Sequence, residues 1–356
     1  MKTLTISFFV LIVMVLNACK TPLGTNYADF MTAKNIQLDE HNISALLGQP
    51  HDMVVVDDLI IVLDSKTDRF FHVFLKNNYN YVGSFIKKGR GPGEETRISP
   101  FFKVYTNDKF YYKSADDLKM AKIKMDNDSL DIIIHDRYNL PQSSLTDVDF
   151  FLVDEFIFSS AGLRAASKDY LVLNYETGGL SEWGESIPLS DKKVNPDLIP
   201  MINQKLTTIN SNDNLIASVF NILPILRIYS LENEKLITEL QMSDALNNRE
   251  IILADQVQNR SREVINYYHR IKSTDDYIYA LYGGFSVSGY FKEGETPHVF
   301  DWSEEIHIWK WDGTPIMKLK LDRPVFSFDI TPDNKKIIAT SVVDVDKLFE
   351  AEIPWD

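Results

Sequence analysis

The chain has 356 residues, enough for two average domains or for one large all-β domain, so length alone does not set the number of domains. Hydrophobic residues make up 44% of the chain and charged residues 25%, which excludes a disordered or fully membrane-embedded protein. The formal net charge of −14 makes nucleic acid an unexpected partner, because binding it requires clustered Lys and Arg.

The first 18 residues have the pattern of a secretory signal. Lys2 precedes the apolar run 4–16, which is too short to span a membrane. The only cysteine of the chain, Cys19, follows in the string LNAC. This string resembles the lipobox of bacterial lipoproteins, although Asn17 replaces the usual small residue. The resemblance implies a diacylglyceryl group on Cys19 and cleavage before it; the alternative is a buried cysteine in an ordinary signal or core segment.

Cleavage after residue 18 would remove Lys2 and change the formal net charge from −14 to −15. With Cys19 lipidated, no thiol remains for a disulfide, a cysteine-ligated zinc ion or a cysteine nucleophile. We therefore expect residues 1–18 to be a signal peptide, residues 19–32 a lipidated linker and residues 33–356 one folded domain.

A pattern of two apolar strands joined by a short polar turn recurs from residue 50 onward. Asp and Asn occupy these turns because their side chains bond the local backbone and tolerate the left-handed conformation. The spacing between successive turns is 46 to 62 residues. The six turns lie at 57–58, 107–108, 154–155, 213–214, 275–276 and 333–334.

A second hairpin follows each of the first five turns, and that of the fifth unit contains the strong turn signal Asp312-Gly313. Four strands per unit and six units predict an all-β fold, a six-bladed β-propeller with four-stranded antiparallel blades. The sixth unit lacks room for a fourth strand before Asp356, so we expect residues 33–41 to complete it from the N-terminal side. A pair of β-sandwiches is the alternative, but sandwiches give no reason for six similar units.

The stretch 54–100 resembles the NHL type of propeller repeat. The matching residues are Asp64, Arg69, Val73, Phe74, Gly89, Gly91, Pro92, Gly93, Glu94 and Pro100. Later blades depart from this pattern, which weakens any transfer of the protein-binding or RNA-binding roles of NHL repeats. The lipobox, GRGPGE, DYIYALYGG and EIHIWKWDGTPIMKLKLDRP together resemble the TolB-like six-bladed propeller lipoproteins of the Bacteroidetes. That resemblance implies a fold and an anchored, exported context, and it assigns no catalytic residue.

The connections between strands differ strongly in length on the two sides of the predicted ring. The turns named above are short, whereas the opposite side carries insertions at 186–204, 244–266 and 285–305. Insertions in repeat proteins gather on the face that binds, so we expect the binding site there. The other possibility is that these segments only cover the ends of the blades.

Five residues on the insertion-bearing side are candidate binding residues. Arg90 lies in the glycine-rich turn GRGPGE, where it could bind an anion or a carbonyl, or could instead hold the blade junction through backbone carbonyls. Arg260, Arg262, Tyr290 and Trp302 belong to the residue types that dominate interfaces.

No catalytic motif is present in the sequence, and we assign no catalytic residue, metal ligand or cofactor. The seven histidines show no paired metal spacing, and DNDSLD at 126–131 lacks the glycine and final glutamate of a calcium loop. Six-bladed lactonases and related hydrolases, however, hold a metal in the central channel through residues of several blades. A metal-dependent hydrolase or lyase therefore remains the alternative function, without positive support for an enzyme.

The sequence favours a monomeric, lipid-anchored module of the cell envelope that binds a protein, peptide or glycan. A purely structural role in envelope assembly is a third possibility. The segment CKTPLG has no acidic run after the cysteine, which favours the periplasmic side of the outer membrane over the cell surface. Apart from the lipid anchor, no membrane contact is expected.

Overall fold

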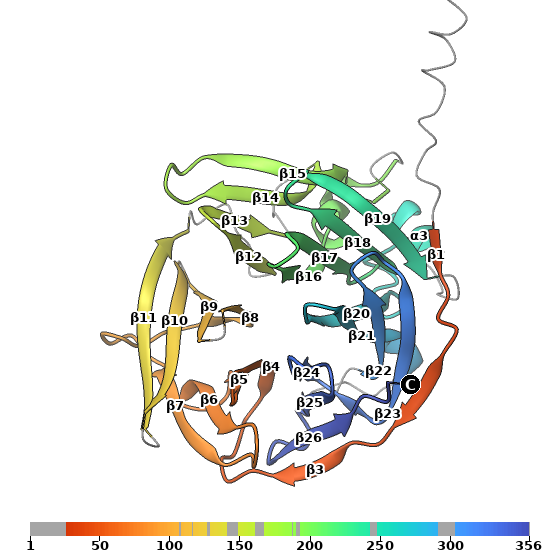
Figure 1. The fold of residues 1–356 in the computed structure, drawn as a ribbon. Coiled ribbons are helices and arrows are strands. Elements are labelled where there is room, and N and C mark those ends of the chain that lie inside the picture. The colour runs from red at the N-terminus through yellow and green to blue at the C-terminus, as the bar shows by residue number, and fades with distance from the viewer. Residues whose placement is uncertain are drawn as a thin grey trace, which may run out of the picture.

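The structure, a computed structural model, shows six β-sheets arranged around a central axis (Figure 1). The six-bladed propeller predicted from the repeats is confirmed, with its four-stranded antiparallel blades. The structure describes residues 26–106, 108–115, 117–126, 129–140, 149–160, 167–186, 188–189, 193–242, 248–290 and 303–355.

The first three blades each contain four consecutive antiparallel strands. Blade 1 consists of β4 (Pro50–Val56), β5 (Leu59–Asp64), β6 (Arg69–Leu75) and β7 (Tyr81–Lys87). Blade 2 consists of β8 (Ile98–Thr106), β9 (Lys109–Ser114), β10 (Asp117–Asp126) and β11 (Ser129–Asn139). Blade 3 consists of β12 (Phe150–Val153), β13 (Phe156–Ser159), β14 (Lys168–Asn174) and β15 (Leu180–Ser186).

The last three blades also receive strands from the N-terminal segment. Blade 4 contains β16 (Lys205–Asn210), β17 (Leu215–Phe220), β18 (Ile225–Ser230) and β19 (Lys235–Met242). Blade 5 contains β20 (Ile265–Ser273), β21 (Tyr277–Ser286), β22 (Ser303–Lys310) and β23 (Pro315–Val325). Blade 6 contains β24 (Ser327–Ile330), β25 (Lys336–Thr340) and β26 (Lys347–Glu352).

In four blades the turn between the first and second strands has the left-handed backbone conformation that its sequence predicts. Asp57, Asp154, Asn214 and Asn334 adopt positive φ values of 55°, 48°, 54° and 59°. Short polar side chains tolerate this left-handed region, which tight hairpin turns require. Gly313 does the same with a φ of 90° between β22 and β23. Local turn chemistry therefore fixes the first hairpin of blades 1, 3, 4 and 6.

Residues 26–42 form an extended strap that crosses the outer edges of three blades (Figure 1). β1 (Asn26–Ala28) pairs in parallel with β19 of blade 4, and β2 (Ala33–Ile36) pairs in parallel with β23 of blade 5. β3 (Asp39–Asn42) then pairs antiparallel with β26 and becomes the fourth strand of blade 6. The ring is thus completed by an N-terminal strand, as predicted.

The strap differs from the sequence expectation in its extent. Residues 33–41 were expected to lie together on blade 6, but residues 33–36 belong to blade 5, and pairing begins at Asn26. The reason is burial: Ile36 and Leu38 enter the hydrophobic core shared by blades 5 and 6. The Leu38 amide also donates to Asp322 Oδ1 at 3.0 Å. The chain therefore changes blade between these two side chains.

The hydrophobic core lies mainly between neighbouring blades. Separate clusters fill the spaces between blades 1 and 2, blades 4 and 5, blades 5 and 6, and blades 6 and 1. Another joins blade 3 to blades 2 and 4. Because each blade buries both faces against its neighbours, apolar side chains lie on both sides of its inner strands, and β5 and β18 are buried along their full length.

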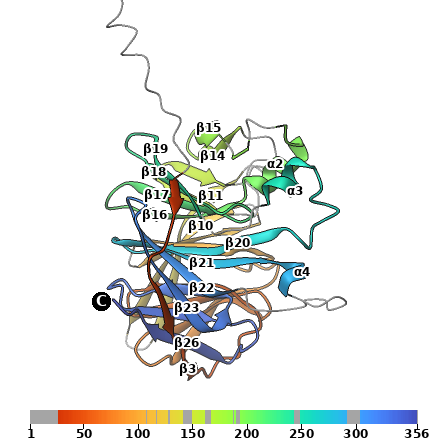
Figure 2. The ribbon, with the colours of Figure 1, turned by 90° about the vertical axis from the view of Figure 1, so that its right-hand side faces the viewer.

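The helices are short and lie on one side of the ring (Figure 2). They are the 3-10 helix η1 (Pro196–Leu198), α2 (Ile199–Ile202), α3 (Arg249–Leu253) and α4 (Val287–Tyr290). All of them fall within the three insertions identified in the sequence. Among the described residues, no helix is long and apolar enough to cross a membrane. We call this side the insertion-bearing face and the opposite side, with the turns between first and second strands, the short-turn face.

Candidate functional site

A cavity of about 580 Å³ occupies the central channel between the six innermost strands. Its lining comes from all six blades. It includes Asp57, Asn212, Asp275 and Pro332, which lie in the turns after the first strands. The cavity therefore reaches the short-turn face. Its size is typical of pockets that hold small molecules.

Asp52 forms one of the charged centres in the inner half of this channel. Its Oδ1 accepts hydrogen bonds from Lys272 Nζ and Ser327 Oγ, each at 3.0 Å, and from the Met53 amide at 2.9 Å. Lys272 Nζ also donates to the Met53 carbonyl at 2.7 Å. Because Lys272 comes from blade 5 and Asp52 from blade 1, this ion pair crosses the channel past blade 6.

Lys103 and Asp149 form the second charged centre. Lys103 Nζ lies 2.6 Å from Asp149 Oδ1 and 2.6 Å from the Thr207 carbonyl, and the Thr207 amide donates to Asp149 Oδ2. Burial lowers the pKa of Lys103 and raises the pKa of Asp149, so desolvation outweighs their mutual attraction. The pair joins blades 2, 3 and 4 at the channel wall.

Arg270 fills the inner end of the cavity. Its guanidinium lies between the rings of Phe101 and Phe326, 4.9 and 5.0 Å from their centroids. It donates to the carbonyl of His269 at 2.6 Å and to the carbonyl of His51. Both aromatic faces and both carbonyls favour a cation at this position. The channel is thus narrowed at this end by a fixed, buried side chain.

Asp329 is the third buried carboxylate of the channel and lies nearer the short-turn face. It is 8% exposed, and its oxygens accept from the amides of Val55 at 2.7 Å and Ile330 at 2.9 Å. Burial raises its pKa to about 6. In the part of the chain that the structure describes, no cationic side chain forms an ion pair with it.

The three channel carboxylates share one structural task. Each accepts a hydrogen bond from a backbone N–H in the innermost strand of the following blade, which would otherwise lack a strand partner. Asp52 accepts from Phe102 at 3.4 Å, Asp149 accepts from Thr207, and Asp329 accepts from Val55. These side chains therefore connect neighbouring blades at the axis.

The donor set of the channel does not fit a divalent metal. The oxygens of Asp52 and Asp149 already hold lysine ammonium groups, and those of Asp329 accept backbone amides. Within the described ranges, no group of three or more His, Cys, Asp or Glu side chains could hold a metal ion. We therefore derive no metal-dependent step for the hydrolase alternative.

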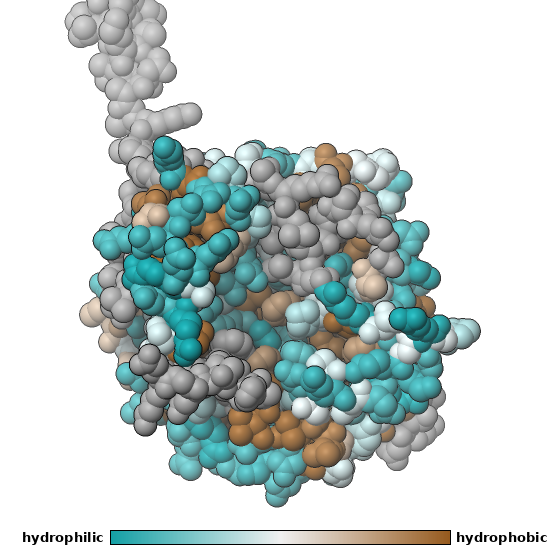
Figure 3. Space-filling model, turned by 180° about the vertical axis from the view of Figure 1, so that it is seen from behind, coloured by the Kyte–Doolittle hydropathy of each residue, from teal (hydrophilic) through white to brown (hydrophobic). Residues whose placement is uncertain are grey.

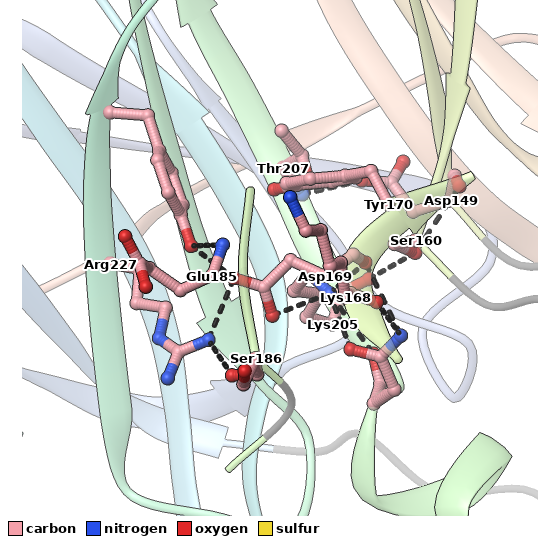
Figure 4. Close-up of polar contacts among 12 residues, drawn as sticks. Asp149, Ser160, Lys168, Asp169, Tyr170, Glu185, Ser186, Lys205, Thr207 and Arg227 are labelled. Atoms are coloured by element: carbon pink, nitrogen blue, oxygen red, sulfur yellow. Dashed lines mark hydrogen bonds and ion pairs between the residues drawn. The ribbon is translucent and has the colours of Figure 1, made fainter. Parts of the chain in front are cut away.

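A second buried charge network lies between blades 3 and 4 (Figure 4). Asp169 has no exposed surface, and its Oδ2 accepts from Arg227 at 2.7 Å and from the Tyr229 hydroxyl. Arg227 also contacts Glu239 Oε2 at 2.6 Å. Lys205 Nζ donates to the Asp169 carbonyl at 2.5 Å, and burial lowers the pKa of Lys205 to about 8. The network has two carboxylates and two cationic side chains, so its net charge is zero.

This network is connected to the channel through the backbone. The Ser160 hydroxyl lies 3.2 Å from the Asp149 carbonyl and 2.9 Å from the Lys205 carbonyl (Figure 4). Asp149 belongs to the channel wall and Lys205 to the blade 3 to blade 4 joint. The joint and the channel wall therefore form one continuous polar structure.

The insertions between blades 3 and 4 and between blades 4 and 5 pack together on the insertion-bearing face. They share a hydrophobic cluster with the strand ends of blade 4. Its fully buried members include Ile202 of α2, Ile252 of α3 and Phe220 of β17. We call the described parts of the three insertions, residues 193–204, 248–264 and 286–290, the platform.

Polar contacts join the three parts of the platform. Asn195 Nδ2 donates to both carboxylate oxygens of Asp255 at 3.1 Å, which links the first insertion to the second. The Arg262 carbonyl accepts from the amide and hydroxyl of Ser288 at 2.7 and 2.8 Å, which links the second to the third. Insertions from three different places in the chain therefore form one connected surface.

Asn248 attaches the platform to the propeller. It is fully buried, and its amide nitrogen donates to the carbonyls of Ile222 and Ile265 at 2.8 Å each. Its Oδ1 accepts from the Ile265 amide at 2.9 Å. One side chain thus holds blades 4 and 5 and the start of α3 in a fixed relation.

A smaller cavity of about 370 Å³ lies beside the platform at the ends of the blade 5 strands. It is lined by Tyr282 and Phe285 of β21, Glu305 of β22, Lys320 of β23 and Pro324. Figure 3 shows the insertion-bearing face, where hydrophilic side chains surround smaller hydrophobic areas. This face therefore offers both projecting and hollowed surface to a partner.

Arg90 is exposed in the turn between blades 1 and 2. That turn is held by Glu94, whose Oε2 accepts from the Gly91 amide at 2.9 Å and whose Oε1 accepts from Lys87 at 2.8 Å. These bonds lower the pKa of Glu94. The turn thus closes through Glu94 and presents Arg90 to the outside, at a different blade junction from the platform.

The other predicted binding residues lie in or beside the platform. Arg260 and Arg262 are on its surface, and Arg260 pairs with Glu263 within the same segment. Tyr290 is the last residue of α4. Trp302 and the predicted lipid attachment site Cys19 lie outside the described residues. The structure therefore brings Arg260, Arg262 and the Tyr290 backbone to one surface and leaves Arg90 apart from them.

Sequence reasoning missed the channel carboxylates. A signal was present, because Asp52 and Asp149 each lie five residues before the turn aspartate of their blade, Asp57 and Asp154. An acidic residue at one fixed place in otherwise apolar inner strands indicates a role at the axis. The platform contact made by Asn248 left no such repeated signal.

The fold is that of a six-bladed β-propeller with a central channel and a platform on one face. The family model described as TolB-like 6-blade propeller-like matches residues 26–333, so the chain belongs to this family. No curated protein matches the chain.

Two solved structures from Bacteroides have a similar fold. A member of the DUF4221 family from Bacteroides vulgatus ATCC 8482 has a TM-score of 0.56 and 11% identity, covering 92% of this chain and 98% of that chain. A protein of Bacteroides fragilis NCTC 9343, described as exported, has a TM-score of 0.54 and 12% identity, covering 91% of this chain and all of that chain. At these identities the likeness concerns the fold alone.

Proposed function

We propose that this protein is a monomeric, lipid-anchored propeller of the cell envelope that binds a protein, peptide or glycan through its insertion-bearing face. The observation that carries the proposal is the platform: three insertions from separate parts of the chain are fastened to each other and to blades 4 and 5. Segments that only covered strand ends would need no mutual contacts. A preformed surface lowers the entropic cost of binding a partner.

The proposed location is supported by the sequence and by one structural relative. The LNAC string at Cys19 supports a lipid anchor, and the Bacteroides fragilis protein of the same fold is described as exported. We place the protein on the periplasmic side of the outer membrane, because no acidic run follows Cys19. Replacing Cys19→Ser should move the protein out of the membrane fraction.

The binding face can be tested by capture from the native envelope. The tagged protein and an Arg262→Glu variant are expressed in the source bacterium, crosslinked and purified, and the partners are compared by quantitative mass spectrometry. The Arg262 side chain is exposed and its contact with Ser288 uses only the backbone carbonyl, so the variant should keep the platform. A partner bound at this face should fall at least fivefold in the variant.

The matched control is Lys335→Glu. Lys335 is exposed in a turn on the short-turn face, and the substitution changes the net charge by the same amount. The partner should remain with this variant. A partner that survives Arg262→Glu but is lost with Lys335→Glu would place binding on the other face and refute the proposal.

A further inference from the structure

The lining of the central channel carries an uneven distribution of charge. Five aspartates and three basic residues line the cavity, which gives a net charge of −2. The basic residues are Lys103, Arg270 and Lys272. The ion pairs in the lining show which aspartates are neutralised and which carry the surplus negative charge.

The basic residues are all engaged in the inner half of the channel. Lys103 is 2.6 Å from Asp149, and Lys272 is 3.0 Å from Asp52. Arg270 is fixed between two aromatic rings, with its Nε 3.9 Å from Asp52. This half therefore holds two carboxylates and three cations and has no need of a further positive charge.

The outer half holds the three remaining carboxylates. Asp57 and Asp275 are exposed at the mouth, and Asp329 lies deeper, where it is 8% exposed. Asp329 accepts from two backbone amides and is also attracted by the charge of Lys272, which is itself paired with Asp52. Among the described residues, none of these three side chains forms an ion pair. A buried carboxylate without an ion-pair partner of its own favours binding of a cation.

The mouth also provides apolar and aromatic surface beside these carboxylates. Val104 and Tyr105 of blade 2 are 39% and 41% exposed and belong to the lining. Ile330 and Pro332 of blade 6 line the same end. An alkyl chain could bury its methylene groups there, and a tyrosine ring attracts an ammonium group. The surface therefore suits an organic cation better than a hydrated metal ion.

We propose that the outer half of the channel cavity binds a protonated primary amine on an alkyl chain, with Asp329 as its buried counter-ion. The ammonium group enters from the short-turn face, between Asp57 and Asp275, and its alkyl chain contacts Val104 and Tyr105. A free diamine and a lysine side chain of a peptide share this chemistry. The site is separate from the platform and lies on the opposite face.

The test is isothermal titration calorimetry on the purified protein at pH 7.5. The probes are cadaverine, which represents a free diamine, and the amide of Nα-acetyl-lysine, which represents a peptide side chain. Neutral probes of the same length, pentanol and the amide of Nα-acetyl-norleucine, serve as references. At least one amine should bind, at least tenfold more tightly than its neutral counterpart, and the preferred amine identifies the source.

Asp329→Asn should weaken binding of that amine at least tenfold, because the substitution removes the charge and preserves the shape. The matched control is Asp346→Asn, which removes an exposed carboxylate of the same blade near its other end. This control should bind as the unchanged protein does. If Asp329→Asn does not fold, as judged by circular dichroism, Asp57→Asn with Asp275→Asn at the exposed mouth should weaken binding several-fold.

The proposal is overturned by three results. The first is that amines and neutral probes bind with equal affinity, or that no probe binds. The second is that the affinity for the amine is unchanged in Asp329→Asn, or in the double variant Asp57→Asn with Asp275→Asn. The third is that Ca²⁺ binds at the site and the amines do not.

Discussion

Asp329 is buried and has no direct ion pair among the described residues, and its raised pKa should make the stability of the protein depend on pH. Its pKa is raised from the ordinary 3.8 to about 6, so between these values the folded state binds more protons than the unfolded state. The free energy of unfolding therefore gains a contribution from Asp329 as the pH falls through this window and loses it as the pH rises. The sign is opposite to that of a carboxylate held by a salt bridge.

Other acidic groups also make the free energy of unfolding depend on pH, so the contribution of Asp329 is obtained by comparison with Asp329→Asn. Urea unfolding of the protein and the variant should be compared at pH 7.5 and pH 4.5. The difference in the free energy of unfolding, protein minus variant, should rise by about 2 kcal/mol at the lower pH. A difference that stays constant would mean that Asp329 titrates as it does in the unfolded chain.

Asp169 illustrates the opposite case, a buried carboxylate with balancing charges. Asp169→Ala would leave Arg227 and Lys205 buried without their main counter-charge. Breaking a buried pair from one side costs about 3 to 5 kcal/mol, so we expect a loss of that size in the free energy of unfolding. Glu176→Ala, in an exposed turn of the same blade, is the control and should change it by less than about 0.5 kcal/mol. Equal effects of the two variants would contradict this reasoning.

At the scale of elements, the strap joins the two ends of the ring. β3 covers the edge of β26, and an uncovered edge strand promotes aggregation. A chain beginning at residue 33 keeps β2 and β3, whereas one beginning at residue 43 loses both together with the buried Ile36 and Leu38. Burial of two such side chains contributes roughly 3 to 6 kcal/mol.

We therefore expect the chain that begins at residue 43 to melt at clearly lower temperature than the chain that begins at residue 33. It should also aggregate in a concentration-dependent way. Scanning calorimetry combined with light scattering measures both properties. If the two chains melted at the same temperature, closure by β3 would contribute little to stability, and contacts between the blades alone would hold the ring.

The strands that follow local rules could be predicted, and those that depend on distant partners could not. The hairpins of each blade follow from alternating side chains and from turns such as Asp57-Asp58 and Asp312-Gly313. β2 gives no comparable signal, because a parallel strand added to a finished blade has no turn to mark it. The position of β2 depends on the space between blades 5 and 6, where Ile36 is buried.

On the scale of the whole molecule, the channel appears only when six blades converge. Asp52, Lys103 and Lys272 are far apart in the chain and meet across the axis. Nothing local in the sequence specifies which lysine reaches which aspartate, so the number of blades could be predicted but the charge pairing could not. The platform is similar, because Asn195 and Asp255 meet only after blades 3, 4 and 5 are in place.

The strap also determines how the proposed anchor would hold the whole propeller. Six residues lie between Cys19 and Asn26, where β1 is fixed to the edge of blade 4, so the chain makes seven residue-to-residue steps. A chain of this length spans at most about 25 Å, so a lipid on Cys19 would keep the rim of blade 4 close to the membrane. Blade 1, opposite blade 4 in the ring, would then face away from it (Figure 1).

Two equivalent turns can report this orientation. Glu232 and Asn78 are exposed in the turns between the third and fourth strands of blades 4 and 1. Since Cys19 is the only cysteine and would be lipidated, Glu232→Cys or Asn78→Cys gives a single site for a fluorescent label. In vesicles containing lipids with a quencher on the headgroup, the label at position 232 should be quenched more strongly than the label at position 78. Equal quenching would mean that the strap does not orient the propeller, because a molecule that turns freely on its tether brings both rims to the membrane equally often.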